Sequence, residues 1–419
     1  MRKAAIILAA GKGTRLNSSL PKALHTICGK PMLGYLVERA RAAGCEKIVV
    51  VAGYKIELVR EYVSTLNLGK SLVVVEQKQQ SGSGHAVRVA SRALGGFGGA
   101  VFVFYCDTPL VSGQTVKELL NTFTARKADA ALLSVELEKP FGYGRVLRGK
   151  SGEVVKIVEE NNASNDEKKI REINVGCYVF DAKKLFWGLK KIKQNPVKKE
   201  YYLTDLVEIF SQSGRVEAVI ARDAEEVLGV NTQKELAKLQ EIAQSRILDG
   251  WMESGVRIPS PKTVTIDADV RIGQDTTVMP HTVLEQGTVI GRGCTVGPFA
   301  RIRGKSRIGH HAVIGNFVEI VRSSVGDYTQ VKHLTYLGDA KIGSHVNIGA
   351  GTITANFDGK KKHQTVIGDK AQIGSGTILV APVKVGRAAV TGAGSVVTKN
   401  RNVPDHGVAV GIPARILKK

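Results

Sequence analysis

A glycine-rich segment flanked by cations stands near the start of the chain. Leu8–Leu16 has the sequence LAAGKGTRL, and Pro21-Lys22 comes shortly after it. Glycines let backbone N–H groups approach phosphate oxygens, a following helix adds its positive end, and Arg15 and Lys22 add fixed charge. Leu16 replaces the third glycine of a dinucleotide fingerprint, and no Gly-Lys-Ser/Thr closes a Walker A loop. The segment predicts a phosphate loop of another type, the alternative being a tight turn with incidental basic residues.

Two polar residues are candidate ligands for a divalent cation beside that loop. Asp107 follows the apolar run Val101–Tyr105, and Asn231 follows Gly229-Val230. Ligands of parallel α/β sheets bind at the carboxyl ends of the strands, which places Asp107 opposite the phosphate loop. Mg²⁺ takes only one or two protein oxygens and fills its shell with phosphates and water. Asp107 and Asn231 are therefore predicted magnesium ligands, although Asp107 alone could also cap a helix or a turn.

One histidine in the second half lies where a six-residue repeat, described below, slips in register. This is His333, and its place beside a register break predicts an exposed side chain. Nitrogen acyl transfer from a thioester needs a base that takes the amine proton, and imidazole titrates in the right range. The alternative is a histidine with no chemical role.

The elements that must position the first group of residues alternate between strands and helices. The runs Ala4–Leu8, Lys47–Ala52, Leu72–Glu76 and Ala100–Tyr105 are rich in Val, Ile and Phe. Longer amphipathic stretches, Pro31–Ala43 and Gly84–Ala93, lie between them. This alternation predicts an α/β domain over residues 1–231, Rossmann-like, with a mostly parallel sheet covered on both faces.

Residues 232–254 predict a linker helix. Thr232-Gln-Lys-Glu235 is a capping box, and apolar residues then recur at spacings of three and four. These apolar residues are Leu236, Leu239, Ala243 and Ile247. We expect Gly250 to stop the helix and Glu253–Gly255 to form its exit.

From residue 255 to 419 the dominant period is six. Aliphatic residues recur at Ile266, Ile272, Val278, Leu284, Ile290, Val296, Ile302, Ile308, Ile314 and Ile320, slip by one at Val325, and resume at Ile342, Ile348, Ile367, Ile373, Leu379 and Val385. This is the hexapeptide signature of a parallel β-helix, in which the aliphatic residue points inward and a small residue turns the corner. The segment Thr354–Val366 breaks the period and predicts an extruded loop. Val403–Lys419 is a candidate terminal cap.

Composition narrows the class of protein. The 419 residues suit two or three domains, and no stretch reaches the length of a membrane helix. The five cysteines are odd in number and contain no CxxC pair, which indicates a reducing cytosol rather than a disulfide framework or zinc site. The net charge of +22 suits anionic partners, but no nucleic-acid-binding signature accompanies it. The basic apolar start resembles a signal peptide, but leads directly into the glycine loop.

Together these motifs resemble a known family. The glycine loop with Pro21-Lys22 is similar to the signature of sugar-1-phosphate nucleotidyltransferases. Further motifs resemble the bacterial bifunctional N-acetylglucosamine-1-phosphate uridyltransferase and glucosamine-1-phosphate acetyltransferase family: Gln77, Gln80–Ala86, Gly142–Arg145, Ile157–Glu159, Asn174–Gly176, Glu200–Asp205, His333–Asp339 and Asn347–Gly359. The resemblance covers nearly the whole chain and implies a left-handed β-helix.

For the first half, the resemblance implies a uridylyltransferase that uses UTP and Mg²⁺. The implied contacts to UTP or UDP-N-acetylglucosamine are Leu8, Ala9, Ala10, Gly11, Lys22, Gln77, Gly82, Ser83, Tyr105, Gly144, Glu159, Asn174 and Asn231. Arg15 and Lys22 would act in catalysis by neutralising phosphate charge. The chain departs from the family at Cys106, usually Gly, and at Ser83, usually Thr.

For the second half, the resemblance implies an acetyltransferase that uses acetyl-coenzyme A. His333 would be the general base, and the sugar phosphate would be bound by Arg303, Tyr336 and Asn347. The implied acetyl-coenzyme A contacts are Ala350, Asn356, Phe357, Ser375 and Ala393. Val321 stands where the family has Lys, beside Arg322, and Phe357 stands where it has Tyr. The family's C-terminal Arg has no clean counterpart beyond Arg415.

These observations predict a cytoplasmic bifunctional enzyme that acetylates glucosamine-1-phosphate and then uridylylates the product. By analogy, hexapeptide acyltransferases imply a homotrimer. The alternative is a uridylyltransferase alone, whose β-helix serves trimerisation or regulation, because Val321 and Phe357 alter the second site. A basic scaffold for nucleic acid, suggested by Lys360–Lys362 and the net charge, is a third hypothesis; we expect neither nucleic acid nor membrane as a partner.

Overall fold

The computed structural model describes residues 1–417, which divide into two compact units. Unit 1 comprises Met1–Ile27 and Pro31–Gln240, and unit 2 comprises Cys28–Lys30 and the chain from Glu241 onward. Within residues 1–417, no helix has both the length and the apolar character that crossing a bilayer would require.

Unit 1 is built on a mixed, mostly parallel sheet with strand order β11-β7-β10-β6-β1-β4-β5. Its strands are β1 (Lys3–Ala9), β4 (Lys47–Ala52), β5 (Leu72–Glu76), β6 (Ala100–Tyr105), β7 (Ala130–Glu136), β10 (Glu172–Asp181) and β11 (Val216–Ile220), with β8 (Arg145–Arg148) and β9 (Val154–Val158) attached through β10. A small hairpin joins β2 (Thr26–Ile27) to β3 (Lys30–Pro31). β10 runs antiparallel to its neighbours β6 and β7, and β8 pairs antiparallel with both β10 and β9.

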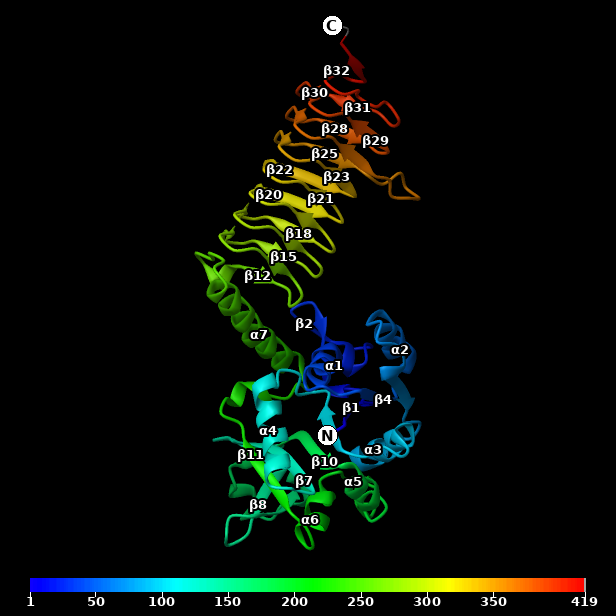
Figure 1. Cartoon of the computed structure of the whole chain (residues 1–419), viewed down its shortest axis with the longest axis vertical. Coiled ribbons are helices and arrows are strands. Elements are labelled where there is room, and N and C mark those ends of the chain that lie inside the picture. Colours follow the sequence, from blue (N-terminus) through cyan, green and yellow to red (C-terminus); the bar gives the residue numbers. More distant parts are fainter. Residues whose placement is uncertain (418–419) are drawn as a thin grey trace. The chain divides into compact units, whose positions relative to one another are not determined.

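Helices surround this sheet (Figure 1). They are α1 (Met32–Ala42), α2 (Ile56–Thr65), α3 (Ser83–Ser91), α4 (Gly113–Ala125), α5 (Ala182–Gly188) and α6 (Asp205–Ser211). Short 3-10 turns are η1 (Thr14–Leu16), η2 (Lys22–Leu24), η3 (Gly69–Ser71), η4 (Arg92–Leu94), η5 (Glu160–Asn162), η6 (Glu167–Lys169) and η7 (Ala224–Val227). The predicted α/β fold is confirmed: β4, β5 and β6 have the predicted bounds, and β1 extends one residue further at each end.

The predicted linker helix is α7 (Gln233–Glu253). Its capping box forms as expected, since the Glu235 carboxylate accepts from the Thr232 amide at 2.8 Å and the Thr232 hydroxyl accepts from the Glu235 amide at 3.2 Å. The predicted stop at Gly250 is wrong, because the helix continues to Glu253. Trp251 packs against the apolar core of unit 2, and this packing offsets the roughly 1 kcal/mol that an interior glycine costs.

Unit 2 is a prism of short parallel strands, as expected for a left-handed parallel β-helix. One face holds β13 (Arg271–Ile272), β16 (Val289–Ile290), β19 (Arg307–Ile308), β21 (Ser324–Val325), β23 (Ala340–Ile342), β26 (Thr365–Ile367) and β29 (Val383–Val385). A second holds β12 (Thr265–Ile266), β15 (Val283–Leu284), β18 (Arg301–Arg303), β25 (Ile353–Ala355), β28 (Ile378–Val380) and β31 (Val396–Val397). The third holds β14 (Thr277–Val278), β17 (Thr295–Val296), β24 (Asn347–Ile348), β27 (Gln372–Ile373), β30 (Val390–Thr391) and β32 (Val408–Gly411).

Two long strands join the second and third faces into one sheet. They are β20 (Val313–Val321) and β22 (Gln330–Gly338), which run around the corner between those faces. Their pairing is seventeen residues apart, as in Ile314 with Val331, whereas Leu284 pairs with Ile302 eighteen residues on. This shorter coil is the physical form of the register slip predicted at Val325.

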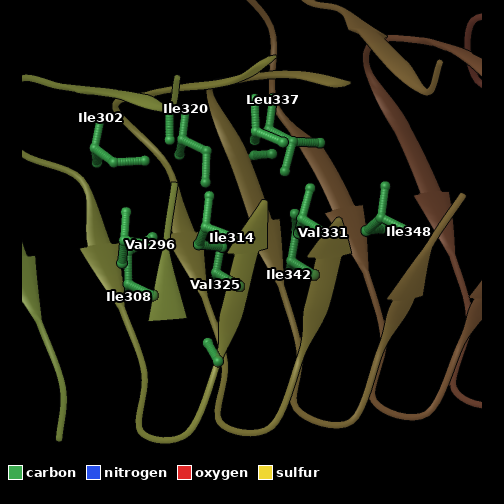
Figure 2. Close-up of a cluster of buried hydrophobic side chains, with 14 of the residues drawn as sticks. Val296, Ile302, Ile308, Ile314, Ile320, Val325, Val331, Leu337, Ile342 and Ile348 are labelled. Carbon is green, nitrogen blue, oxygen red and sulfur yellow. The ribbon is translucent and has the colours of Figure 1, made fainter. Parts of the chain in front are cut away.

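The repeated aliphatic residues fill the interior of the prism. Figure 2 shows them stacked coil upon coil, from Val296 through Ile314 and Leu337 to Ile348. Every aliphatic position predicted to point inward is buried. Small or β-branched residues four positions further on are buried as well: Thr276, Thr282, Thr288, Ala300, Ser306 and Ala312. The hexapeptide pattern therefore identifies most of the core of unit 2, to which the structure adds Val331 and Leu337 on β22.

The extruded loop lies between β25 and β26 (orange in Figure 1). It is shorter than the predicted Thr354–Val366, because Thr354 and Thr365 are buried strand residues at its two ends. At the end of the prism, β32 pairs antiparallel with β33 (Ala414–Ile416). The predicted cap Val403–Lys419 includes this hairpin, and its last two residues lie outside the described chain. A 3-10 turn, η8 (Pro261–Thr263), precedes the first coil.

The stacked interior predicts a sharp difference between neighbouring positions on β20. Ile314→Ala, which opens a cavity in the core, should lower the free energy of unfolding by about 2–5 kcal/mol. Val313→Ala, at the adjacent outward position, should cost less than about 1 kcal/mol. Denaturant unfolding followed by circular dichroism measures both, and equal costs at the two positions would contradict this account of the core.

Candidate active sites

A cavity of about 280 Å³ lies at the carboxyl ends of β1 and β6 in unit 1. It is the place where a parallel sheet binds its ligand. Nine residues predicted to bind the nucleotide line it: Leu8, Ala9, Ala10, Gly11, Lys22, Gln77, Gly82, Ser83 and Tyr105. The fold thus gathers separate sequence motifs around one hollow large enough for part of a nucleotide.

Two glycines in this site are required by the backbone. Gly13 adopts φ +69, and a side chain there would lie 2.9 Å from the Lys22 Cβ atom. Gly82 adopts φ +95, and a Cβ atom there would lie 2.5 Å from the Tyr201 carbonyl oxygen. Any larger residue would strain the backbone and displace the neighbouring segment. The glycines therefore let the phosphate loop turn toward Lys22 and let the Gly82 segment pack on Tyr201.

The predicted cations and the predicted metal ligands converge on one point. The Lys22 ammonium donates to Asp107 Oδ2 at 2.8 Å and to Asn231 Oδ1 at 2.9 Å. Arg15 Nη2 also donates to Asn231 Oδ1, at 2.9 Å. The Asn231 backbone amide is held in turn by the Glu235 carboxylate at 2.7 Å. Two oxygen ligands and two cations are thus placed at the edge of the cavity, where phosphate charge has to be balanced.

The residues implied for the sugar are Gly144, just before β8, Glu159, just after β9, and Asn174 on β10, and they do not line the 280 Å³ cavity. The Asn174 amide donates to the Gly144 carbonyl at 2.8 Å. A side chain at Gly144 would lie 3.4 Å from Glu159 Oε2, so glycine keeps this approach open. Glu159 Oε1 accepts from the Thr204 hydroxyl at 3.0 Å. These contacts assemble a polar surface from three strands and the start of α6.

Two half-buried carboxylates belong to this surface. Burial raises the pKa of Glu159, with the negative charge of Glu200 adding to the effect. Burial, reinforced by Glu159 and Glu208, raises the pKa of Asp205 to about 6. Both carboxyl groups are therefore easier to protonate than exposed ones, and a bound hydroxyl-rich ligand can exchange hydrogen bonds with them.

Tyr105 connects the cavity to the sugar side. Its ring packs on Gly176, where a side chain would lie 2.8 Å from the ring. Its hydroxyl bonds with Ser83, whose own hydroxyl accepts from the Leu203 amide at 3.0 Å. Burial raises the Tyr105 pKa, so the phenol stays neutral and can donate. Ser83 makes these contacts with a hydroxyl, which is the group that the family's Thr would also supply.

Several residues around the cavity, Gln80 among them, were not assigned a role individually by sequence reasoning. The Gln80 side chain donates to the Ala10 carbonyl at 2.8 Å and fixes the phosphate loop. Cys106 lines the cavity as a buried thiol, and burial raises its pKa so that it stays neutral. Asp107, Glu200, Ala23 and Ala86 complete the lining. Gln80 lay in a recognised motif, but its partner is 70 positions away and no local pattern reveals it.

In unit 2, the predicted base and most coenzyme contacts share one corner of the prism. Asn316 pairs in register with His333, and hydrogen bonds link the next coils through Ala350 and Ser375. The following coil presents Ala393, next to Gly394, whose amide donates to the Ser375 carbonyl at 2.8 Å. These residues therefore form a column along the corner edge. His333, Ser375 and Ala393 are exposed on it, as predicted for His333.

The imidazole of His333 is oriented by its neighbour in this column. Its Nδ1 atom lies 2.9 Å from Asn316 Oδ1. When the amide oxygen accepts a proton from Nδ1, the other ring nitrogen, Nε2, keeps its lone pair. The geometry therefore supports a base whose free nitrogen is available to a ligand.

A second column carries the residues implied for the sugar phosphate. Glu319 pairs in register with Tyr336, and Glu319 Oε1 accepts from Arg303 Nη1 at 2.9 Å. Arg303 also lines a hollow of about 620 Å³, together with Val321 and Arg322. Asn347 is exposed on β24, on the third face, and pairs with Gln330 of β22. Arg303 and Tyr336 are thus brought together through Glu319, and Asn347 stands on the adjoining face.

The departures from the family pattern have visible consequences. The Val321 side chain is buried, so this position offers no charge to a ligand. The adjacent Arg322 forms a double ion pair with Asp339, at 2.7 Å through both Nε and Nη2. Asn356 donates to the same carboxylate, while Phe357 stands exposed in the extruded loop. Arg322 is therefore held by an internal partner, although it lines the hollow next to Arg303.

Two known families match the chain, one within unit 1 and one within unit 2. The family described as MobA-like NTP transferase domain matches residues 5–169. The family described as bacterial transferase hexapeptide, with six repeats, matches residues 269–304 and 287–322. A crystal structure of apo UDP-glucose pyrophosphorylase shares 19% identity over 59% of the chain, with a TM-score of 0.49, a likeness too distant to support an argument.

Similarity to curated relatives extends over the full chain. "Bifunctional protein GlmU" of Streptococcus equi subsp. zooepidemicus is 41% identical, over 100% of this chain and 97% of its own. The protein of the same name from Shouchella clausii is 39% identical over 99% of this chain and 97% of its own. That from Clostridium perfringens is 41% identical over 98% and 96%. The chain belongs to the family of bifunctional GlmU proteins.

Proposed function

We propose that the chain makes UDP-N-acetylglucosamine, a cell-wall precursor, in two steps. Unit 2 transfers an acetyl group from acetyl-coenzyme A to glucosamine-1-phosphate, and unit 1 transfers a uridylyl group from UTP to the product. The observation that carries the proposal is the presence of two separately built sites in a chain that matches bifunctional relatives from end to end. We assign residues 1–231 to uridylyl transfer, 232–254 to the linker and 255–419 to acetyl transfer.

Uridylyl transfer requires positioning and charge neutralisation more than proton transfer. An oxygen of N-acetylglucosamine-1-phosphate attacks the α-phosphorus of UTP in line, and the bond to the pyrophosphate oxygen breaks. The attacking oxygen is already anionic, so no general base is needed. Lys22 and Arg15, at the rim of the cavity, neutralise the charge that develops on the phosphates.

The donor set at this rim suits Mg²⁺. Asp107 and Asn231 both place an oxygen within 2.9 Å of the Lys22 ammonium, so the two oxygens converge on one cation position. Within residues 1–417 no cluster of three or more His, Cys, Asp or Glu is arranged to hold a metal, but Mg²⁺ needs only one or two protein oxygens beside phosphates. When bound, the ion supplies further neutralisation of phosphate charge.

Asp107→Asn tests the metal assignment. Loss of the carboxylate charge should lower pyrophosphate release from UTP and N-acetylglucosamine-1-phosphate by roughly 100-fold and raise the Mg²⁺ concentration needed for half-maximal rate. Asp166→Asn, at an exposed carboxylate that pairs with Lys169, is the matched control and should behave as the wild type. An unchanged Mg²⁺ requirement in Asp107→Asn would refute the assignment.

Acetyl transfer depends on the column of exposed residues around His333. The amine nitrogen of glucosamine-1-phosphate attacks the thioester carbonyl, the C–S bond breaks, and coenzyme A leaves as its thiol. His333 Nε2 takes the proton from the amine, while Asn316 holds Nδ1. Arg303 and Tyr336, with Asn347, bind the sugar phosphate, and Ala350, Asn356, Phe357, Ser375 and Ala393 bind acetyl-coenzyme A. Neither role needs a charge at Val321.

His333→Ala should slow acetyl transfer by about 10²- to 10⁴-fold, because the proton acceptor is lost. Uridylyl transfer by the same protein should be unchanged, which also shows that the chain folds. His406→Ala, at an exposed histidine away from the column, is the control. Thiol release from acetyl-coenzyme A is the measurement. Full thiol release by His333→Ala would instead favour a different base. If the wild type released no thiol, the uridylyltransferase-only alternative would be favoured.

We further propose a cytoplasmic homotrimer. None of the five cysteines forms a disulfide, which suits a reducing compartment. Hexapeptide repeats favour oligomers, and the prism carries an exposed aromatic stack along the corner that bears His333. His281 stacks on Phe299 at 4.7 Å and Phe299 on Phe317 at 5.2 Å between ring centroids. An apolar edge of this kind suits burial against further copies of the chain.

Phe317→Glu tests this interface. A charge in the stack should convert the three-chain assembly into single chains, as measured by light scattering after gel filtration. Tyr328→Glu is a matched control, because Tyr328 is a similarly exposed aromatic stacked between His311 and His345 on another corner. A wild-type mass of one chain, or dissociation by Tyr328→Glu alone, would contradict the proposed interface.

A further inference from the structure

One arginine in unit 1 is buried more completely than its charge would ordinarily allow. The Arg145 side chain, at the start of β8, is only 2% exposed. Removing a guanidinium from water is costly unless charged and polar partners surround it. An apolar side chain could fill the same space in the core, so the role of the Arg145 charge has to be read from the groups that it contacts.

Those partners belong to three segments that are separate in sequence. Arg145 Nη2 lies 2.7 Å from Glu160 Oε2 and also donates to the Lys168 carbonyl at 3.5 Å. Arg145 Nη1 donates to the Tyr143 carbonyl. Glu160 Oε2 closes the arrangement by accepting from the Gly142 amide at 3.2 Å. The ion pair therefore ties the turn before β8 to η5 and η6.

Two of the tied segments border the polar surface assigned to the sugar. Gly144 is the residue before Arg145, and Glu159 is the residue before Glu160. The Gly144 carbonyl accepts from the Asn174 amide at 2.8 Å, which brings in β10. A shift of the turn or of η5 would therefore separate Gly144 from Glu159.

We propose that Arg145 is a positioning residue for the sugar-phosphate substrate of uridylyl transfer, acting through its buried ion pair with Glu160. This inference rests on the proposed function of unit 1. The pair sets the spacing between Gly144 and Glu159 and leaves the 280 Å³ cavity unaltered, since neither Arg145 nor Glu160 lines it. Loss of the pair should thus act on the sugar phosphate and leave UTP binding nearly intact.

The test compares Arg145→Lys with Arg148→Lys in the full chain. Arg148 lies on the same strand and forms a 2.7 Å ion pair with Glu172, away from Gly144 and Glu159. Pyrophosphate release should show a KM for N-acetylglucosamine-1-phosphate raised roughly tenfold in Arg145→Lys, with the KM for UTP within about twofold of wild type. Arg148→Lys should change neither KM. Equal effects of the two variants on the sugar KM, or no effect of either, would overturn the proposal.

A second variant and a second readout cover loss of folding and loss of activity. Glu160→Gln keeps an acceptor for the Gly142 amide but removes the charge, and should raise the same KM. Hydrogen exchange should be faster at Gly142–Gly144 in Arg145→Lys than in Arg148→Lys. A wild-type protein that releases no pyrophosphate would refute the proposed function itself. In that case, wild-type exchange rates at Gly142–Gly144 in Arg145→Lys would separately refute the positioning role of the Arg145–Glu160 ion pair.

Discussion

The constraint on which unit 2 depends is that each face of each coil sends one aliphatic side chain inward. Because Ile302, Ile320 and Leu337 stack in the interior, the residues between them must occupy fixed outward and corner positions. Strands in register then repeat every position at the spacing of a sheet, about 4.8 Å. His333 and Ala350 consequently lie on one edge of the prism, and the register of the strands is sufficient to place them there. A six-residue repeat thus produces a linear array of chemical groups, and variation at outward positions leaves the core untouched.

In unit 1 the functional groups are brought together by a parallel sheet rather than by stacked coils. Parallel strands end on one edge of the sheet, so Leu8, Tyr105 and the residues that follow them meet there although Leu8 and Tyr105 are 97 positions apart. Lys22 and Asn231 reach this edge from turns. Lys22 binds the Asp107 carboxylate directly, and Asn231 is linked to Asp107 through Lys22. The cations and oxygen ligands form one small network, which holds the phosphate site in shape before any substrate arrives.

Much of this could be predicted from the sequence because it is encoded locally. The bounds of β4 and β6, the capping box of α7 and the inward positions of the prism all follow from short-range patterns. The end of α7 could not be predicted, because Trp251 packs on the apolar core of unit 2 and the helix therefore continues past Gly250. The contacts of Gln80 with Ala10, and the Arg145–Glu160 pair, join segments that no period connects. Candidate site residues came mainly from family motifs, whereas their mutual contacts came from the fold.

The central claim is that one chain carries both activities in sequence. The most direct measurement supplies the purified protein with UTP, Mg²⁺ and glucosamine-1-phosphate, and follows thiol and pyrophosphate release as acetyl-coenzyme A is added. The account predicts that thiol release comes first and that pyrophosphate release follows only when acetyl-coenzyme A is present. If acetyl-coenzyme A gives no thiol release, while the same protein releases pyrophosphate once N-acetylglucosamine-1-phosphate is supplied in place of glucosamine-1-phosphate, the account is contradicted and a uridylyltransferase joined to a structural β-helix remains.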